Sequence, residues 1–188
     1  MVPEAPLEQT EDGLLPAGEG WFVLNAREAA WRRWEGLGKY PRLEGPEAVF
    51  PQLGIGLTVL EPGEPMSMYH WEPEQEDFLV LSGEALAIVE GEERLLRQWD
   101  FLHCPAGTSH VLVGAGDGPC VVFAVGAREN QTEDGGGYTV NETALRHGAG
   151  VEVETNDANV AYGRFPERES TRYREGWLPD FSQLESDP

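Results

Sequence analysis

From residue 50 to residue 126, apolar residues come in short runs that are separated by turn-forming residues. The runs are rich in Val, Leu, Ile and Phe, and the turns include EPGEP, SGE, EGEE, PAGT and GAGDGP. Strands this short, at this spacing, are typical of an antiparallel sandwich or small barrel. The expected strands lie near residues 53–60, 66–72, 77–81, 85–89, 93–97, 100–104, 109–113 and 120–125.

The flanking segments have different patterns. Before the barrel, Trp21–Leu24 is expected to form a strand, and Asn25 to cap a helix over residues 26–38 in which Trp31 and Trp34 share one face. After it, residues 128–137 are expected to form a linker. The chain is therefore expected to comprise an acidic flexible tail, a strand and helix packed on the barrel, the barrel, and a C-terminal extension, at residues 1–20, 21–48, 49–126 and 127–188.

The C-terminal extension is expected to contain two short helices and an arm. Asn141 is a candidate cap for a helix over residues 142–147 that ends at Gly148, and a second helix is expected near Asp157. The last part, residues 163–188, mixes Arg, aromatic residues and Pro. It could lie on the barrel or on a partner subunit, or be partly disordered.

Candidate ligands gather in YHWEPEQEDFLVLSG, residues 69–83. Side chains alternate along a strand, so His70 and Glu72 point the same way, and Glu76 begins the next buried strand. A buried carboxylate is costly unless it is compensated. A divalent cation would compensate it, because such a cation binds neutral imidazole and ionised carboxylate together.

A second group follows about thirty residues later, in WDFLHCPAGTSHVLVG, where His110 enters a strand after a tight turn. Together the two segments resemble the paired motifs of the cupin superfamily, in the form of a small single-domain cupin with one type-2 conserved barrel. The positions that match the first motif are Gly63, His70, Glu72, Glu76 and Gly83. Those that correspond to the second are Trp99, Pro105, Gly107, His110 and Gly114. The resemblance covers roughly residues 50–126 and implies a mostly β fold, an antiparallel double-stranded β-helix or jelly-roll barrel.

Carried over position by position, the resemblance implies the metal ligands His70, Glu72, Glu76 and His110, holding one divalent Mn, Fe, Ni or Zn ion. The chain departs from the family pattern in three places: Glu72 replaces the second histidine, Trp99 replaces Gly, and Gly114 replaces Asn. Two carboxylates would balance the charge of a dication and make it a poorer Lewis acid. Glu72 could instead be a base or orient the substrate.

The remaining histidines and the two cysteines are expected to be structural. His103 is predicted to pack structurally, with a place in the cavity or at a subunit contact as the alternatives, and His147 to end a helix. Cys104 and Cys120 are expected to be buried thiols rather than a disulfide.

Composition excludes several classes of partner. The net charge of −21, from 13 basic and 34 acidic residues, disfavours binding to nucleic acid or anionic lipid. No apolar stretch approaches membrane-spanning length, and MVPEAPLEQTEDG does not look like a signal peptide, so a cytoplasmic location is expected by default.

The first functional hypothesis is a metal-dependent enzyme that acts on a small polar molecule by oxygenase, isomerase or lyase chemistry, with Glu72 or Glu76 assisting proton transfer. The alternatives are a non-catalytic small-molecule-binding or sensing module and a structural barrel with a vestigial metal site. A homodimer is expected from the resemblance, and the apolar outer face of FLVL is in keeping with it.

Overall fold

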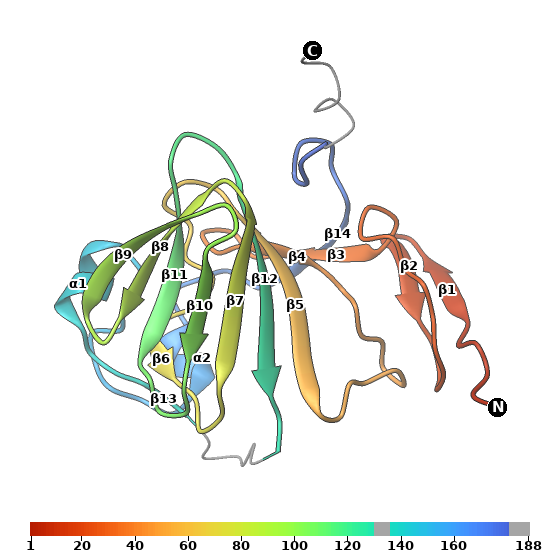
Figure 1. Ribbon diagram of the computed structural model, residues 1–188, viewed down its shortest axis with the longest axis horizontal. Helices are drawn as coiled ribbons and strands as arrows, with labels where there is room; N and C mark the ends of the chain where they lie inside the picture. Colours follow the sequence, from red (N-terminus) through yellow and green to blue (C-terminus); the bar gives the residue numbers. More distant parts are fainter. Residues whose placement is uncertain (130–135, 181–188) are drawn as a thin grey trace.

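The computed structural model describes residues 1–129 and 136–180, and antiparallel strands form most of the regular structure (Figure 1). The mostly β fold predicted from the sequence is confirmed. The barrel strands are β5 (Leu53–Leu60), β6 (His70–Trp71), β7 (Glu76–Ser82), β8 (Glu84–Val89), β9 (Glu92–Arg97), β10 (Phe101–Cys104), β11 (His110–Ala115) and β12 (Cys120–Ala127). The strand expected over residues 66–72 is much shorter, since only His70–Trp71 pairs as a regular strand.

Two sheets face each other, and the flanking segments add strands to both. One sheet has the order β13-β6-β11-β8-β9, and the other has the order β10-β7-β12-β5-β4-β3-β14. The added strands are β13 (Gly137–Tyr138), β4 (Lys39–Pro41), β3 (Ala30–Arg33) and β14 (Glu169–Arg172). The larger sheet therefore continues beyond the barrel with strands from both ends of the chain.

The core lies between the two sheets. As strand alternation predicts, Phe78 and Val80 point inward, whereas Leu79 and Leu81 on the same strand stay partly exposed. The inward-facing residues, contributed by both sheets, are Leu60, Phe78, Val80, Ala85, Ala87, Cys104, Leu112, Cys120 and Val122.

The C-terminal arm covers part of the outer face of the larger sheet. Trp31 is fully buried there, with ring centroids 5.7 Å from Tyr173 and 5.0 Å from Trp177, and Val59 and Val121 lie beneath it. Of the placements left open for the arm, its described part lies on the chain's own barrel. Residues 181–188 are outside the described residues.

The helix expected over residues 26–38 is wrong. Asn25 does cap a turn, since its side chain accepts a hydrogen bond from the Arg27 amide at 2.9 Å, but the chain then enters β3. This strand pairs with β4 on one side and β14 on the other. Hydrogen bonding to two partner strands and burial of Trp31 outweigh the helical propensity of the segment. The strand expected at Trp21–Leu24 is also wrong, because only Trp21 pairs, in a single bridge to Glu4.

The flexible tail expected at the N-terminus is wrong for residues 7–16. β1 (Leu7–Thr10) and β2 (Gly13–Pro16) form a hairpin, at the end of the molecule away from α1 in Figure 1. The turn residues are Glu11 and Asp12, and the Asp12-Gly13 pair that overlaps them is the signal that the sequence analysis overlooked. Gly13 has a φ of 131°, and a Cβ atom there would lie 2.5 Å from the Ala29 carbonyl oxygen, so glycine is required.

Both C-terminal helices are confirmed. α1 (Glu142–Arg146) begins after Asn141, whose side chain accepts a hydrogen bond from the Ala144 amide, and α2 (Ala158–Ala161) begins after Asp157. The centre of the predicted 128–137 linker, residues 130–135, is outside the described residues.

The two cysteines lie in the core, and the helices are short. Cys104 and Cys120 are both free and buried, as expected. Within residues 1–129 and 136–180, no helix has the length and apolar character needed to span a bilayer.

Candidate metal centre

Three strand ends bring the candidate ligands together. His70 and His110 begin β6 and β11 and are register partners, so the pairing of these strands places the two imidazoles side by side. Glu76 begins β7 on the opposing sheet. The two sheets thus present histidine and glutamate toward each other across the barrel.

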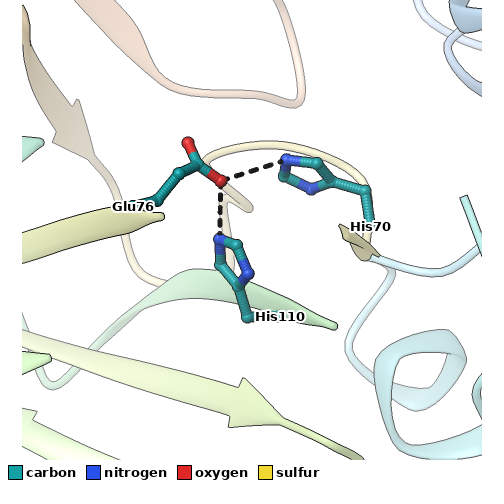
Figure 2. Close-up of side chains that lie close together, drawn as sticks. All are labelled: His70, Glu76 and His110. Atoms are coloured by element: carbon teal, nitrogen blue, oxygen red, sulfur yellow. Dashed lines mark ion pairs between the residues drawn. The ribbon is translucent and has the colours of Figure 1, made fainter. Parts of the chain in front are cut away.

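The three side chains converge on a small volume (Figure 2). Glu76 Oε2 lies 3.1 Å from His110 Nε2 and 3.7 Å from His70 Nε2. One ligand atom from each residue lies within 4.8 Å of the other two. These distances suit three protein ligands around one cation.

Backbone carbonyls orient both imidazoles. His70 Nδ1 lies 2.8 Å from the Met68 carbonyl oxygen, and His110 Nδ1 lies 3.0 Å from that of Thr108. With Nδ1–H donating to these carbonyls, each Nε2 keeps its lone pair and points toward Glu76. Metal-binding histidines are commonly held in this tautomer by such a bond.

Two of the three converging ligand atoms lack hydrogen-bond partners among the described residues. Glu76 Oε2 and His110 Nε2 are buried, and although they are close, neither has a hydrogen bond of acceptable geometry within the described residues. Buried polar atoms are almost always satisfied, so such orphans need a reason. A divalent cation between them supplies one, and the residues present fit such an ion.

The pKa shifts of the two histidines differ. Burial lowers the pKa of His70, which keeps its imidazole neutral. Burial also disfavours charge on His110, but the adjoining Cys104 and Glu76 side chains outweigh it and raise its pKa to about 10. Without metal, His110 therefore favours its protonated form, and a bound cation would displace that proton.

The pKa shifts of the two carboxylates also differ. Burial alone would raise the pKa of Glu76, but His110 and His70 lower it overall, so this carboxylate is ionised. For Glu72, burial and then the charge of Glu76 raise the pKa to about 7. The site therefore pairs a firmly charged carboxylate with one that can exchange a proton near neutral pH.

Glu72 does not join the group of three. Its Oε1 lies 3.7 Å from His70 Nε2, at the edge of the site. The four predicted ligands thus separate into three that converge and one beside them.

A cavity of about 270 Å³ opens in front of the carboxylates. Its lining includes Glu72, Glu74, Glu76 and Arg128, and Arg128 is held by two hydrogen bonds to Glu44, at 2.9 and 3.0 Å. The rest is formed largely by small residues on β5 and β12, which pair directly as Gly54 with Gly126 and Gly56 with Ala124. Small side chains on these two strands leave room for a ligand.

Other residues singled out from the sequence lie elsewhere. His103 is exposed on the outer face of the larger sheet, where its Nδ1 lies 2.6 Å from Asp77 Oδ1. His147 ends α1 and bonds Glu93 at 2.9 Å. Neither reaches the converging ligands.

Aromatic residues of both flanking segments lie close to the site, and the sequence analysis missed them as site residues. The Tyr138 ring lies 5.9 Å from His70 and 5.6 Å from the Tyr162 ring, which in turn stacks 4.9 Å from Trp34. The only signal was the abundance of aromatic residues in the extensions. No spacing rule connects segments more than a hundred residues apart.

The match to a protein-family model agrees with this fold. Residues 56–126 match the Cupin_2 family model, described as a cupin domain. No curated protein matches the chain.

Among solved structures, the chain is similar to a sugar phosphate isomerase of the cupin superfamily from Silicibacter pomeroyi. The identity is 31% and the TM-score 0.44, over 50% of this chain and 60% of that one. A putative sugar phosphate isomerase from Acidithiobacillus ferrooxidans has 29% identity and a TM-score of 0.41, over 43% and 53% of the two chains. A Cupin 2 conserved barrel domain protein from Salinispora arenicola has 25% identity and a TM-score of 0.43, over 49% and 76%. The match thus spans less than two thirds of both isomerase chains. Together with the paired histidines on adjoining strands, the family match identifies residues 56–126 as a cupin domain.

Proposed function

We propose that the chain is a metal-dependent cupin enzyme that acts on a small oxygen-bearing molecule by proton transfer. His70, Glu76 and His110 hold one divalent transition-metal ion, of Mn, Fe, Ni or Zn. The observation that carries the proposal is the pair of buried atoms without hydrogen bonds, Glu76 Oε2 and His110 Nε2, beside an open cavity. A bound cation would polarise a carbonyl or hydroxyl oxygen of the substrate.

Glu72 is the proton-transfer residue in this proposal. It lines the cavity next to Glu76 without joining the three converging ligands, so its carboxylate is placed to accept and return a substrate proton. In the metal-free protein, burial and the charge of Glu76 raise its pKa to about 7. Glu76, whose pKa is lowered, stays charged as a ligand. Among the chemistries open to a cupin, a base beside a polarising cation favours isomerase or lyase chemistry.

Metal content tests the first half of the proposal. Inductively coupled plasma mass spectrometry on tag-free protein is expected to find about one equivalent of a transition metal per chain. His70→Ala and His110→Ala should lose it, whereas the matched control His103→Ala, which removes an exposed histidine on the outer face, should keep it. No metal in the wild type, even after reconstitution, would refute the site.

Proton exchange tests the second half. Metal-loaded protein would be incubated in D₂O with a panel of small hydroxy and keto compounds, and loss of C–H signals followed by NMR. Exchange is expected for the wild type and should be abolished in Glu72→Gln while the metal is retained. Loss of the metal in this variant would make Glu72 a ligand. Metal binding without exchange on any compound would instead favour the non-catalytic binding module.

The cytoplasmic location remains a prediction. Cys104 and Cys120 are both free rather than joined in a disulfide, which is in keeping with a reducing compartment. Fractionation of the native host's cells would test it.

A further inference from the structure

A second cavity adjoins the metal centre and differs from it in chemistry. It has a volume of about 300 Å³, and its lining is Trp34, Leu37, Gly38, Tyr40, Pro41, Ile55, Gly56, Thr58, Met66, Tyr162 and Arg168. No carboxylate lines it, although the chain has 34 acidic and only 13 basic residues. An apolar, carboxylate-free cavity with one arginine is unusual on such an acidic protein and indicates an anion with an apolar body.

Aromatic rings form a continuous wall from the metal ligands to this arginine. The centroids of His70 and Tyr138 lie 5.9 Å apart, those of Tyr138 and Tyr162 5.6 Å, and those of Tyr162 and Trp34 4.9 Å. At the far end, the Arg168 guanidinium lies 4.1 Å from the Trp34 ring centroid. The wall thus connects Arg168 with the metal ligands through a series of neighbouring rings.

The Arg168 guanidinium is available to a ligand. It makes no ion pair with a carboxylate in the part of the chain that the structure describes, and its closest polar contact is a long one, 3.5 Å from Nη1 to Tyr40 Oη. By contrast, Arg128 in the first cavity is engaged by Glu44. A planar guanidinium fixed on an aromatic ring is well suited to bind a carboxylate.

Gly56 keeps the two cavities connected. It belongs to the lining of both, and a Cβ atom built on it would meet no atom within 4 Å. Its backbone is in an ordinary conformation, so neither strain nor a close contact requires glycine here. Glycine inside a strand is destabilising, and a reason for it is close approach of a ligand.

We propose that the substrate is an elongated organic acid with an aromatic or other flat apolar body, which spans both cavities past Gly56. Its carboxylate lies on Arg168, its body packs on Trp34 and Tyr162, and an oxygen at its other end reaches the metal centre. Only the contact between the substrate oxygen and the metal centre rests on the proposed function. A polyhydroxylated ligand fits less well, because most of this lining is apolar and its polar groups are limited to Arg168, the hydroxyls of Tyr40, Thr58 and Tyr162, and the Trp34 indole, whose N–H is already bonded to the Pro166 carbonyl.

The probe for the test is 3-(4-hydroxyphenyl)propanoate, whose carboxylate and phenol oxygen lie at opposite ends of an aromatic body. Two related molecules serve as comparisons. Gluconate keeps the carboxylate without the apolar body, and 4-ethylphenol keeps the body without the carboxylate. Binding would be measured by titration calorimetry on metal-loaded protein and on EDTA-treated protein.

Two variants are decisive. Gly56→Leu fills the passage and should weaken binding of the probe at least about tenfold without loss of metal. Its matched control is Gly118→Leu, which adds the same side chain at a turn where a Cβ also meets nothing within 4 Å. Arg168→Gln should weaken the probe about tenfold and leave 4-ethylphenol unchanged.

The outcomes separate the two proposals. Loss of probe binding in Arg168→Gln, on EDTA-treated as well as loaded protein, supports the inference even if the protein binds no metal. If the protein binds metal but the probe affinity is unchanged in Gly56→Leu and Arg168→Gln, the inference is overturned. The proposed metal-dependent function is then unaffected. Failure of the wild type to bind the probe, or gluconate binding as tightly as the probe, also overturns it.

Discussion

At the scale of single residues, Gly114 shows how a close backbone contact selects a side chain. It stands where the family pattern has Asn, and a Cβ atom there would lie 2.2 Å from the Glu61 carbonyl oxygen. The Gly63 amide donates to the Gly114 carbonyl at 2.8 Å, and the Gly114 amide donates to that of Glu64 at 2.9 Å. This departure from the family pattern therefore reflects packing of a loop against β11.

Gly114→Ala is expected to lower the free energy of unfolding by about 1–3 kcal/mol, because the backbone of the loop must shift to admit the methyl group. Chemical denaturation measures the change. Gly118→Ala is the control, since its Cβ meets nothing within 4 Å. Equal stability of the two variants would contradict the explanation.

Glu72 makes the metal-free protein sensitive to pH. Its pKa is about 7 in the folded protein against an ordinary 4.5, so the folded form holds the proton more tightly. The contribution of this group to stability is therefore present at low pH and is lost as the pH rises from about 4.5 to about 7.

Glu72→Gln should remove this part of the pH dependence. In EDTA-treated protein, the difference in Tm between about pH 5 and about pH 8 is expected to be smaller in the variant than in the wild type. Glu47→Gln, at an exposed carboxylate that does not line the cavity, provides the comparison. An unchanged pH profile in Glu72→Gln would mean that burial does not hold the proton on Glu72.

At the scale of elements, the larger sheet depends on strands from both ends of the chain. β3 lies between β4 and β14, and the turn after β14 places Trp177 5.0 Å from the buried Trp31 ring. Lys39, which is almost fully buried, pairs with Glu61 at 2.6 Å and lies 5.6 Å from the Trp177 ring centroid. The arm thus closes a small second core on the outside of the barrel.

Trp177→Ala should therefore destabilise the protein by about 2 kcal/mol, mostly through lost apolar burial. Thermal unfolding and limited proteolysis after residue 165 would measure the effect on stability and on attachment of the arm. Leu95→Ala, at a side chain that is 62% exposed, should change stability little. An arm equally resistant to protease in the Trp177 variant would contradict this packing role.

At the scale of the whole molecule, a homodimer stays a prediction. Trp99 and Phe101 are 66% and 64% exposed, on the edge of the larger sheet formed by β10. An unpaired edge with large apolar side chains is a common site of association. The net charge of −21 on each copy opposes association, so salt should strengthen it.

Light scattering after size exclusion is expected to give twice the chain mass, with the dimer favoured at higher salt. Phe101→Lys should shift the protein to the monomer, while Arg94→Lys on β9, which preserves the charge there, should not. A monomer at all concentrations and salt conditions would refute the prediction.

The amino-acid sequence by itself determined the barrel and the two histidines of the candidate metal centre. Short apolar runs and turn residues act locally, so the barrel strands could be predicted to within about two residues of their ends, except for the strand expected over residues 66–72. The histidine spacing was recognisable because it lies within two short segments, and the N-terminal caps of α1 and α2 follow from single residues, Asn141 and Asp157.

Only the tertiary structure decided what depends on distant partners. Residues 26–38 carry a helical pattern, but residues 30–33 become a strand between β4, which follows directly, and β14, which comes from the other end of the chain. Which carboxylate joins the histidines follows from how the two sheets face each other, which brings Glu76 to the centre and leaves Glu72 beside it. The aromatic wall joins Trp34 to Tyr162, and no local pattern links them, because their contact exists only once both extensions have packed on the barrel.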